Sequence, residues 1–282
     1  MSHVYNHRRN LPDHRDLVHF APAATSRLPL KFDLWAEYPE IRRWDQSSEG
    51  SCGGHSAARA AQHELGKSGV TFTQNWTADD ISPGDRVSPA FQYYAARLLM
   101  GTADQDSGVD NRSLFQGLRK YGSVREADMP YIPGQFAAPP TARAFQDATR
   151  WENVTYRQVV PTHGNLRATL VAGHAIVQAF AVPDYFEQPS IFDPATGYLE
   201  LPHDVPSFSS YLGGHDVVIT GYDYTRSTFP VPVFLIDNSW SDSWGQAFDA
   251  PSGRAGRFAM DARWQGNSQL VMDLTALISD QA

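Results

Sequence analysis

The sequence predicts an α+β fold, with a mainly helical first half and a second half built from short strands. Three segments carry helix-forming residues between capping residues, and they cover 51–66, 88–100 and 110–121. Four later segments are short, rich in β-branched and aromatic residues and separated by Pro, Gly and Ser; they cover 173–182, 215–224, 231–238 and 256–260. Helices followed by antiparallel strands favour two lobes with a groove between them.

The first 30 residues are expected to form an arm rather than a domain. They are rich in His, Arg, Asp, Pro and Ala and show little apolar periodicity. The helix predicted over 51–66 has Ser51 at its N-cap and Gly66 at its end. Cys52 therefore stands at the beginning of a helix.

Two further helices complete the predicted first half. The helix over 88–100 has Ser88 as its cap and a proline in its first turn, and the helix over 110–121 ends at a glycine. We place the boundary between the lobes near residue 150. The expected organisation is an arm over 1–30, a helical lobe over 31–150 and an antiparallel β lobe over 151–282, with the two lobes forming one domain.

Composition excludes several classes of protein. No stretch approaches 18 consecutive apolar residues, so no membrane-spanning segment is expected. The net charge of −8 argues against nucleic acid as a partner, because phosphate binding needs a positive surface. The polar start, with Arg8 and Arg9, does not resemble a secretory signal peptide, and the single cysteine excludes an internal disulfide. These features favour a cytoplasmic protein in a reducing compartment, although export without a signal stays open.

The position of Cys52 suggests a chemical role. Unsatisfied backbone N–H groups and the helix dipole favour negative charge at a helix start, which favours the thiolate over the thiol. The thiolate is the nucleophilic form of cysteine. The alternative is a small buried side chain without chemical function, which is the commoner role of a lone cysteine.

Three other residues strengthen the chemical interpretation. Gln46 lies six residues before Cys52, His215 follows far downstream, and Asn238 begins an Asn-Ser-Trp element 23 residues after His215. This order resembles that of the papain-like cysteine peptidases. Further segments similar to that family cover 11–16, 118–131 and 256–258. His174 also follows a glycine and precedes a strand, but no Asn-Ser-Trp element follows it at this spacing.

The resemblance implies a role for each residue of this set. Cys52 would attack the scissile carbonyl and form an acyl-thioester, and His215 would stabilise the thiolate as an imidazolium and protonate the leaving amine. Asn238 would orient the imidazole, and Trp240 would cover the contact between His215 and Asn238. Gln46 would donate its amide to the developing oxyanion. No metal or organic cofactor is expected in such a reaction.

Substrate contacts are predicted on four residues. Ser107 and Gly108 match the position of the family's Gly-rich segment, while Gly53 and Gly214 adjoin the proposed catalytic pair. Papain has an aromatic residue after its nucleophile, so we expect the glycines after Cys52 to open space beside the thiol for a bulky substrate. Asp216, if it faces the groove, would raise the pKa of His215.

Two alternatives to a peptidase remain open at this point. A chain with this fold could bind peptides without cutting them, or an amine could intercept the thioester in place of water, which gives acyl transfer. The expected partner in each case is a protein or peptide, and no oligomeric state is predicted. The arm is expected either to pack across the back of the fold or to lie over the groove.

Overall fold

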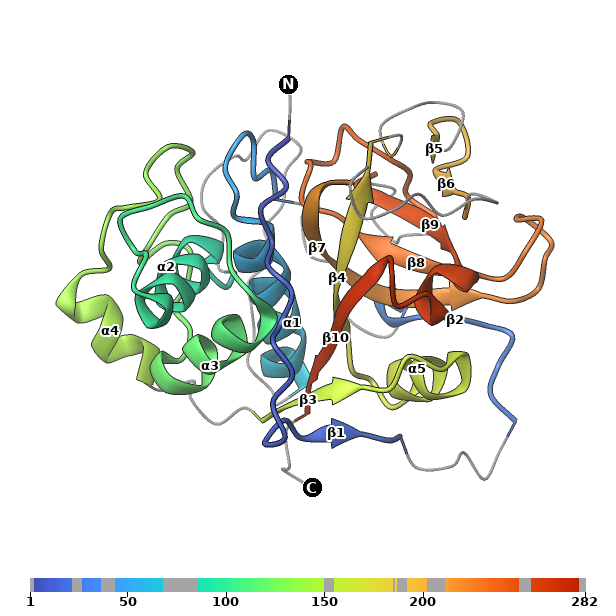
Figure 1. The fold of residues 1–282 in the computed structure, drawn as a ribbon, viewed down its shortest axis with the longest axis horizontal. Coiled ribbons are helices and arrows are strands. Elements are labelled where there is room, and N and C mark those ends of the chain that lie inside the picture. Colours follow the sequence, from blue (N-terminus) through green and yellow to red (C-terminus); the bar gives the residue numbers. More distant parts are fainter. Residues whose placement is uncertain are drawn as a thin grey trace.

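The structure is a computed structural model of the 282-residue chain, and it describes residues 3–21, 27–36, 44–67, 86–149, 155–184, 186, 192–201, 211–248 and 255–278. Helices α1–α4 lie on one side and a large sheet lies on the other, with the first residues of the chain running between them (Figure 1). None of the helices described is both long enough and apolar enough to cross a membrane.

The three helices expected from the sequence are confirmed within one or two residues. They are α1 (Cys52–Lys67), α2 (Pro89–Met100) and α3 (Asn111–Tyr121), and a short α4 (Ala142–Ala148) follows them. The Ser88 hydroxyl accepts a hydrogen bond from the Phe91 N–H at 3.1 Å, which caps α2. Gly66, expected to end the first helix, lies inside α1.

The sheet contains ten strands in the described part of the chain. They are β1 (Val18–His19), β2 (Lys31–Asp33), β3 (Tyr156–Val159), β4 (Ile176–Pro183), β5 (Phe192–Asp193), β6 (Tyr198–Leu199), β7 (Tyr211–Asp223), β8 (Val233–Asp237), β9 (Arg257–Asp261) and β10 (Val271–Leu277). Their order is β1-β3-β10-β4-β7-β8-β9-β6-β5, and β2 also pairs with β7. The four strands expected from the sequence form the continuous antiparallel run β4-β7-β8-β9.

Elements from outside the expected β lobe join this sheet. Strand β2, in the range expected to be helical, pairs with β7, and β1 from the arm pairs with β3. A helix, α5 (His163–Val171), also lies in the second half, where only strands were expected. The division of the chain near residue 150 stays a prediction. Strands from before this residue join the sheet, and a helix lies after it.

The packing of α1 against the sheet decides where the candidate site forms. Ala58 and Ala61 of α1 share one buried hydrophobic cluster with Val217 and Ile219 of β7. Small alanine side chains allow a helix to approach a sheet closely. This contact brings the beginning of α1 beside the middle of β7.

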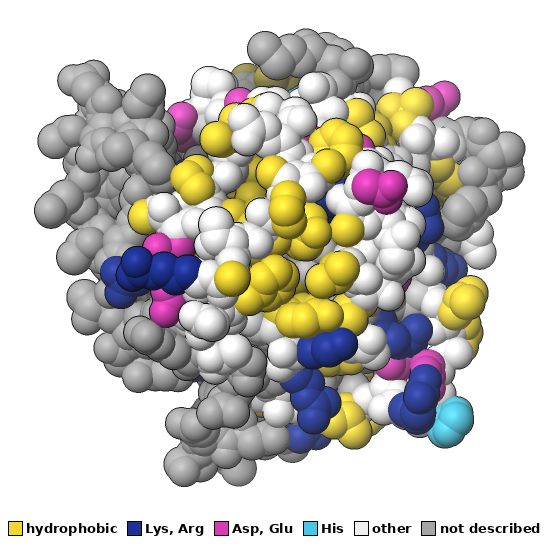
Figure 2. Space-filling view, turned by 90° about the vertical axis from the view of Figure 1, so that its left-hand side faces the viewer, with side chains coloured by type: hydrophobic (Ala, Val, Ile, Leu, Met, Phe, Trp, Pro, Cys, Tyr) yellow, Lys and Arg dark blue, Asp and Glu magenta, His cyan; other side chains and the backbone are white. Residues whose placement is uncertain are grey.

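The outer face of the helical part is partly apolar. Figure 2 views this face, and hydrophobic side chains gather near its middle. Leu98 and Ile132 are the exposed large hydrophobic residues of segment 86–149. This face lies on the outside of the helical part, whereas the candidate site lies where that part meets the sheet.

Candidate active site

Cys52 is buried at the first position of α1. The Ser51 carbonyl accepts a hydrogen bond from the His55 N–H at 3.1 Å, so Ser51 occupies the N-cap position expected for it. The backbone N–H groups of Asp216 and Gly53 favour the thiolate and act to lower the pKa of Cys52, against the effect of burial. A Cβ on the next residue, Gly53, would lie 2.9 Å from Asp216 Oδ2, so the beginning of α1 lies against β7 at the residue after His215; in the described part of the chain, His215 Nδ1 has no hydrogen-bond partner.

His215 is held by a neighbouring strand of the sheet. Its Nε2 lies 2.9 Å from Asn238 Oδ1, and Asn238 follows the last residue of β8. The antiparallel pairing of Val218 with Asp237 sets this register. Trp240 stacks on the imidazole with ring centroids 5.1 Å apart, so one face of the ring is covered as the resemblance implied.

Gln46 is fixed by Ser239, the residue after Asn238. The Ser239 hydroxyl donates to Gln46 Oε1 at 2.5 Å, and the Gln46 backbone N–H donates to the Ser239 carbonyl at 2.9 Å. The Gln46 side-chain amide donates one hydrogen to the Glu49 carbonyl at 3.0 Å. Gln46 and Asn238, distant in sequence, are thus joined through one serine, a link that no feature of the sequence predicts.

The arm covers these residues. The His7 N–H donates to the Gly214 carbonyl at 3.0 Å, and the Arg8 N–H donates to the Val109 carbonyl at 2.9 Å. The arm is therefore hydrogen-bonded on one side to the sheet and on the other to the segment before α3, as an extended peptide would be. Of the two expected positions, the arm takes the one over the groove.

Aromatic side chains of the arm reach the proposed catalytic pair. The His3 ring stacks on Trp240 with centroids 4.0 Å apart, and the Tyr5 ring meets His215 edge-on at 5.8 Å. Cys52 and His215 are both buried in this arrangement. Residues 3–8 therefore close the site.

Burial controls the ionisation of the closed site. Burial raises the pKa of the Cys52 thiol, and the negative charge of Asp216 raises it further. Burial also lowers the pKa of His215 to about 3, although the hydrogen bond to Asn238 opposes this shift. The closed conformation thus favours a neutral thiol and a neutral imidazole over the ion pair expected from the sequence.

One expectation about the surroundings of Cys52 is wrong. A Cβ on Gly53 would lie 2.5 Å from Val109 Cγ2 and 2.9 Å from Asp216 Oδ2, so the space beside the thiol is filled. A Cβ on Gly54 would lie 2.6 Å from the Cβ of Tyr93. The two glycines allow close packing of α1. In this conformation the Asp216 carboxylate is paired with His7, and the pKa of His215 is lowered by burial.

The other predicted substrate contacts lie along the arm. Gly108 has φ +65°, and a Cβ there would collide with the Asn6 carbonyl oxygen. Gly214 contributes the carbonyl that receives the His7 N–H. Ser107 instead turns its hydroxyl to Thr102 Oγ1 at 2.8 Å, so its contacts are made within its own loop.

Sequence reasoning missed a buried ion pair at the same place. His7 Nδ1 lies 2.6 Å from Asp216 Oδ2, and both side chains are fully buried. Burial alone would lower the pKa of His7, but the charges of Asp216 and Asp273 more than offset this and raise it to about 9. Nothing in the sequence marks His7, because its partners lie on β7 and β10.

The described residues contain no group of three or more His, Cys, Asp or Glu side chains placed to hold a metal ion. His55, which lies close to Cys52 on α1, belongs to the core. Its ring meets Tyr131 edge-on at 4.5 Å, and its Nδ1 lies 2.9 Å from the Ser51 carbonyl oxygen.

Known structures share this fold. Xylellain, a cysteine protease from Xylella fastidiosa, superimposes with a TM-score of 0.75 at 25% identity, over 98% of this chain and 96% of that one. The procathepsin B S9 of Trypanosoma congolense gives a TM-score of 0.64 at 17% identity, over 95% of this chain and 82% of that one. Procathepsin L 3 of the Tenebrio molitor larval midgut gives a TM-score of 0.61 at 15% identity, over 93% of this chain and 73% of that one. The expected resemblance to papain-like cysteine proteases is confirmed.

A curated protein also matches in sequence. It is an uncharacterised peptidase C1-like protein of Acanthamoeba polyphaga mimivirus, 28% identical over 166 residues, which cover 56% of this chain. The match spans about half the length of that relative. No protein-family model matches the chain.

Proposed function

We propose that this chain is a papain-like cysteine peptidase that hydrolyses peptide bonds with Cys52 as nucleophile and His215 as its proton carrier. The hydrogen bond between His215 Nε2 and Asn238 Oδ1 carries the proposal. Because Asn238 binds Nε2, the other ring nitrogen, Nδ1, is left without a hydrogen-bond partner in the described part of the chain, and the proposal assigns it to the Cys52 thiol. The cleft of the enzyme would be the groove between the helical part and the sheet.

The proposed reaction has two halves. The Cys52 sulfur attacks the carbonyl carbon, and the C–N bond breaks as His215 gives its proton to the leaving amine. The acyl-thioester is then attacked by water, which loses a proton to His215. The C–S bond then breaks, which releases the carboxylic acid and restores the Cys52 thiolate beside the protonated His215.

The supporting residues follow from their contacts. Asn238 would hold the imidazole orientation, and Trp240 would shield this contact from water. Gln46 would supply its amide to the oxyanion, together with the backbone N–H of Cys52. The contact with Ser239 holds the Gln46 amide so that its nitrogen, rather than its oxygen, is available to the substrate.

The arm makes the described conformation a latent one. Residues 3–8 occupy the place that a substrate needs, and their burial of the pair disfavours the reactive thiolate. Turnover would therefore require displacement of the arm. The proposed substrate is an extended segment of a protein or peptide.

The test uses the full chain carrying His7→Glu, a substitution chosen to release the arm. We expect cleavage of a peptide mixture, an alkylation profile of Cys52 that stays reactive below pH 7, and loss of that reactivity in His215→Ala. Gln46→Ala should lower turnover by roughly 10²–10³-fold. Absence of cleavage, with an ordinary thiol profile near pH 8.5, would favour a binding module. A product that carries an added amine would favour acyl transfer.

A further inference from the structure

One side chain of the arm fills an acidic pocket beside the candidate site. The imidazole of His7 lies between two carboxylates, with Nδ1 2.6 Å from Asp216 Oδ2 and Nε2 3.9 Å from Asp273 Oδ2. Within the described residues, no hydrogen-bond donor other than this imidazole reaches the Asp216 carboxylate. A buried carboxylate without a cationic partner is strongly disfavoured, so the pocket requires a positive charge.

Two more carboxylates act on Asp216, whereas Arg9, which lines the cavity beside Asp273, donates to the carbonyls of Ser268 and Val271. Asp273 and Asp110 both act on the ionisation of Asp216, and His7 is the cation that opposes them. When the arm leaves, the pocket keeps its carboxylates and loses that cation. A ligand that replaces the arm must bring a positive group, or the carboxylates must take up water or protons.

The pocket adjoins the reacting atoms. The Asp216 carboxylate lies beside the residue after Cys52, since a Cβ on Gly53 would stand 2.9 Å from its Oδ2, and Asp216 directly follows His215 in β7. The Gly214 carbonyl accepts the backbone N–H of His7, and the His7 side chain enters the pocket. A peptide bound by the same carbonyl would place one of its side chains in the same pocket.

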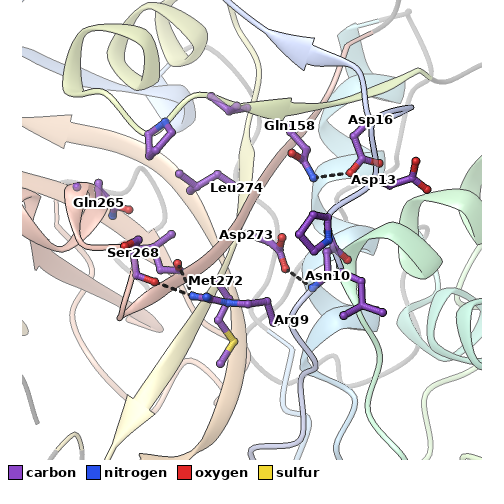
Figure 3. Close-up of a pocket in the computed structure, with 16 residues that line it drawn as sticks. Arg9, Asn10, Asp13, Asp16, Gln158, Gln265, Ser268, Met272, Asp273 and Leu274 are labelled. Atoms are coloured by element: carbon purple, nitrogen blue, oxygen red, sulfur yellow. Dashed lines mark hydrogen bonds between the residues drawn. The ribbon is translucent and has the colours of Figure 1, made fainter. Parts of the chain in front are cut away.

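A cavity lies beside the pocket, on the side of Asp273. Asp273 lies on β10 and also lines a cavity of about 480 Å³, walled on one side by arm residues 9–13. Figure 3 shows Asp273 between β10 and the arm, where it accepts the Asn10 N–H at 3.1 Å. Departure of residues 3–8 would leave Asp273 Oδ2, which lies 3.9 Å from His7 Nε2, facing the vacated place, so a longer cation could reach Asp273 while Asn10 stays bound.

We propose that Asp216 and Asp273 form a specificity pocket that selects peptides with a basic side chain, lysine or arginine, at the position that His7 occupies in the closed protein. This proposal rests on the peptidase function proposed above and names its substrate class. His7 is thus an intramolecular occupant of the pocket, and substrates compete with it for the same two carboxylates.

The first measurement is cleavage by the full chain carrying His7→Glu. Internally quenched peptides are made in pairs that differ at one position, which holds arginine in one peptide and norleucine in the other. The value of kcat/KM is measured for both members of each pair. We expect a preference for arginine of roughly tenfold or more at one position, because close charge pairs removed from water have large coupling energies. Asp273→Asn should reduce that preference several-fold, whereas Asp147→Asn, on the remote helix α4, should leave it unchanged.

The second measurement is binding, which does not need catalysis. Labelled peptides with the sequence of arm residues 3–10, carrying arginine or norleucine in place of residue 7, are titrated into the full chain with Cys52→Ala and His7→Glu. Fluorescence anisotropy should show tighter binding of the arginine peptide. The difference should shrink with Asp273→Asn and persist with Asp147→Asn.

The outcomes separate the two proposals. A preference for arginine that depends on Asp273, in cleavage or in binding, supports the acidic pocket. Cleavage without a preference, or with a preference that survives Asp273→Asn, overturns the pocket and leaves the peptidase function standing. Selective binding without cleavage supports the pocket and overturns the peptidase function. If the protein neither cleaves the peptides nor binds the arginine peptide selectively, both proposals are overturned.

Discussion

The ion pair between His7 and Asp216 should decide how tightly the arm closes the site. Both side chains are fully buried, and their polar atoms lie 2.6 Å apart. Replacing His7 with glutamate removes the cation and brings a third carboxylate toward Asp216 and Asp273. The substituted arm can remain docked only with like charges buried together, so we expect segment 3–8 to leave the groove.

The size of the effect follows from the burial of the pair. Removing one partner of a buried ion pair costs about 3–5 kcal/mol, because the other charge stays buried without compensation. Each 1.4 kcal/mol changes an equilibrium about tenfold, so the ratio of docked to released arm should fall by at least roughly 10²-fold. The contacts of arm residues 9–19, including Arg112 with Asp16, remain in place. Release should therefore be local.

Alkylation of Cys52 reports this release directly. The chain has a single cysteine, so any incorporated label belongs to it. When opening is fast relative to labelling, the labelling rate follows the open fraction, and His7→Glu should raise it by roughly 10²-fold near pH 7. The matched control is His14→Glu on the same arm, where the side chain is 94% exposed, and its rate should stay within about twofold of the wild type.

One result would refute this reasoning. If folded His7→Glu protein is alkylated as slowly as the wild type, the arm is not the barrier or the ion pair does not anchor it. An unchanged unfolding midpoint would show that the variant retains its fold. Equal acceleration by His14→Glu would also count against the argument, because that residue makes no buried contact.

Three further predictions concern pH and stability. The pKa of His7 is raised to about 9, so its contribution to docking is complete below about pH 6.5 and is lost as the pH rises through 9; the difference in alkylation rate between wild type and His7→Glu should shrink between pH 7 and 10. Gly53→Ala should lower the free energy of unfolding in urea by about 1–3 kcal/mol, because its Cβ meets Val109, whereas Gly66→Ala in the same helix, with no atom within 4 Å, should raise it by about 0.5–1 kcal/mol. Arg257→Met should cost about 3–5 kcal/mol because its buried guanidinium pairs with carboxylates at 2.8 and 2.9 Å, while Arg263→Met, at a half-exposed position, should cost less than about 1 kcal/mol in the same assay.

Local signals in the sequence were sufficient for the helices and the central strands. Ser88 caps α2 as expected, because capping depends on residues within one turn, and Asp110 caps α3 in the same way. The order of Gln46, Cys52, His215 and Asn238 was informative for a different reason. Four residue types in a fixed order are much more specific than any single residue, and the structure brings His215 and Asn238 into contact.

Features that depend on distant packing could not be predicted in this way. A glycine after Cys52 is compatible with an open space beside the thiol and with close packing against a neighbour. Only the structure shows that Val109 and Asp216 pack against Gly53. Strand β2 is three residues long and carries no pattern of its own; its pairing with β7 makes it a strand. His7 is one of ten histidines, and its role appears only when β7 and β10 surround it.

Asp216 connects substrate selection with the reactivity of the thiol. Its negative charge is the second cause, after burial, of the raised pKa of Cys52. A cation in the pocket offsets that charge, so binding of a basic side chain and ionisation of the thiol favour each other. The arm also brings a cation, but it buries the sulfur at the same time, and burial is the larger cause. A basic peptide that leaves the sulfur in contact with water would therefore lower the pKa of Cys52 through its charge without raising it through burial. The bound arm raises that pKa by burial, and this is the difference between a substrate and the arm.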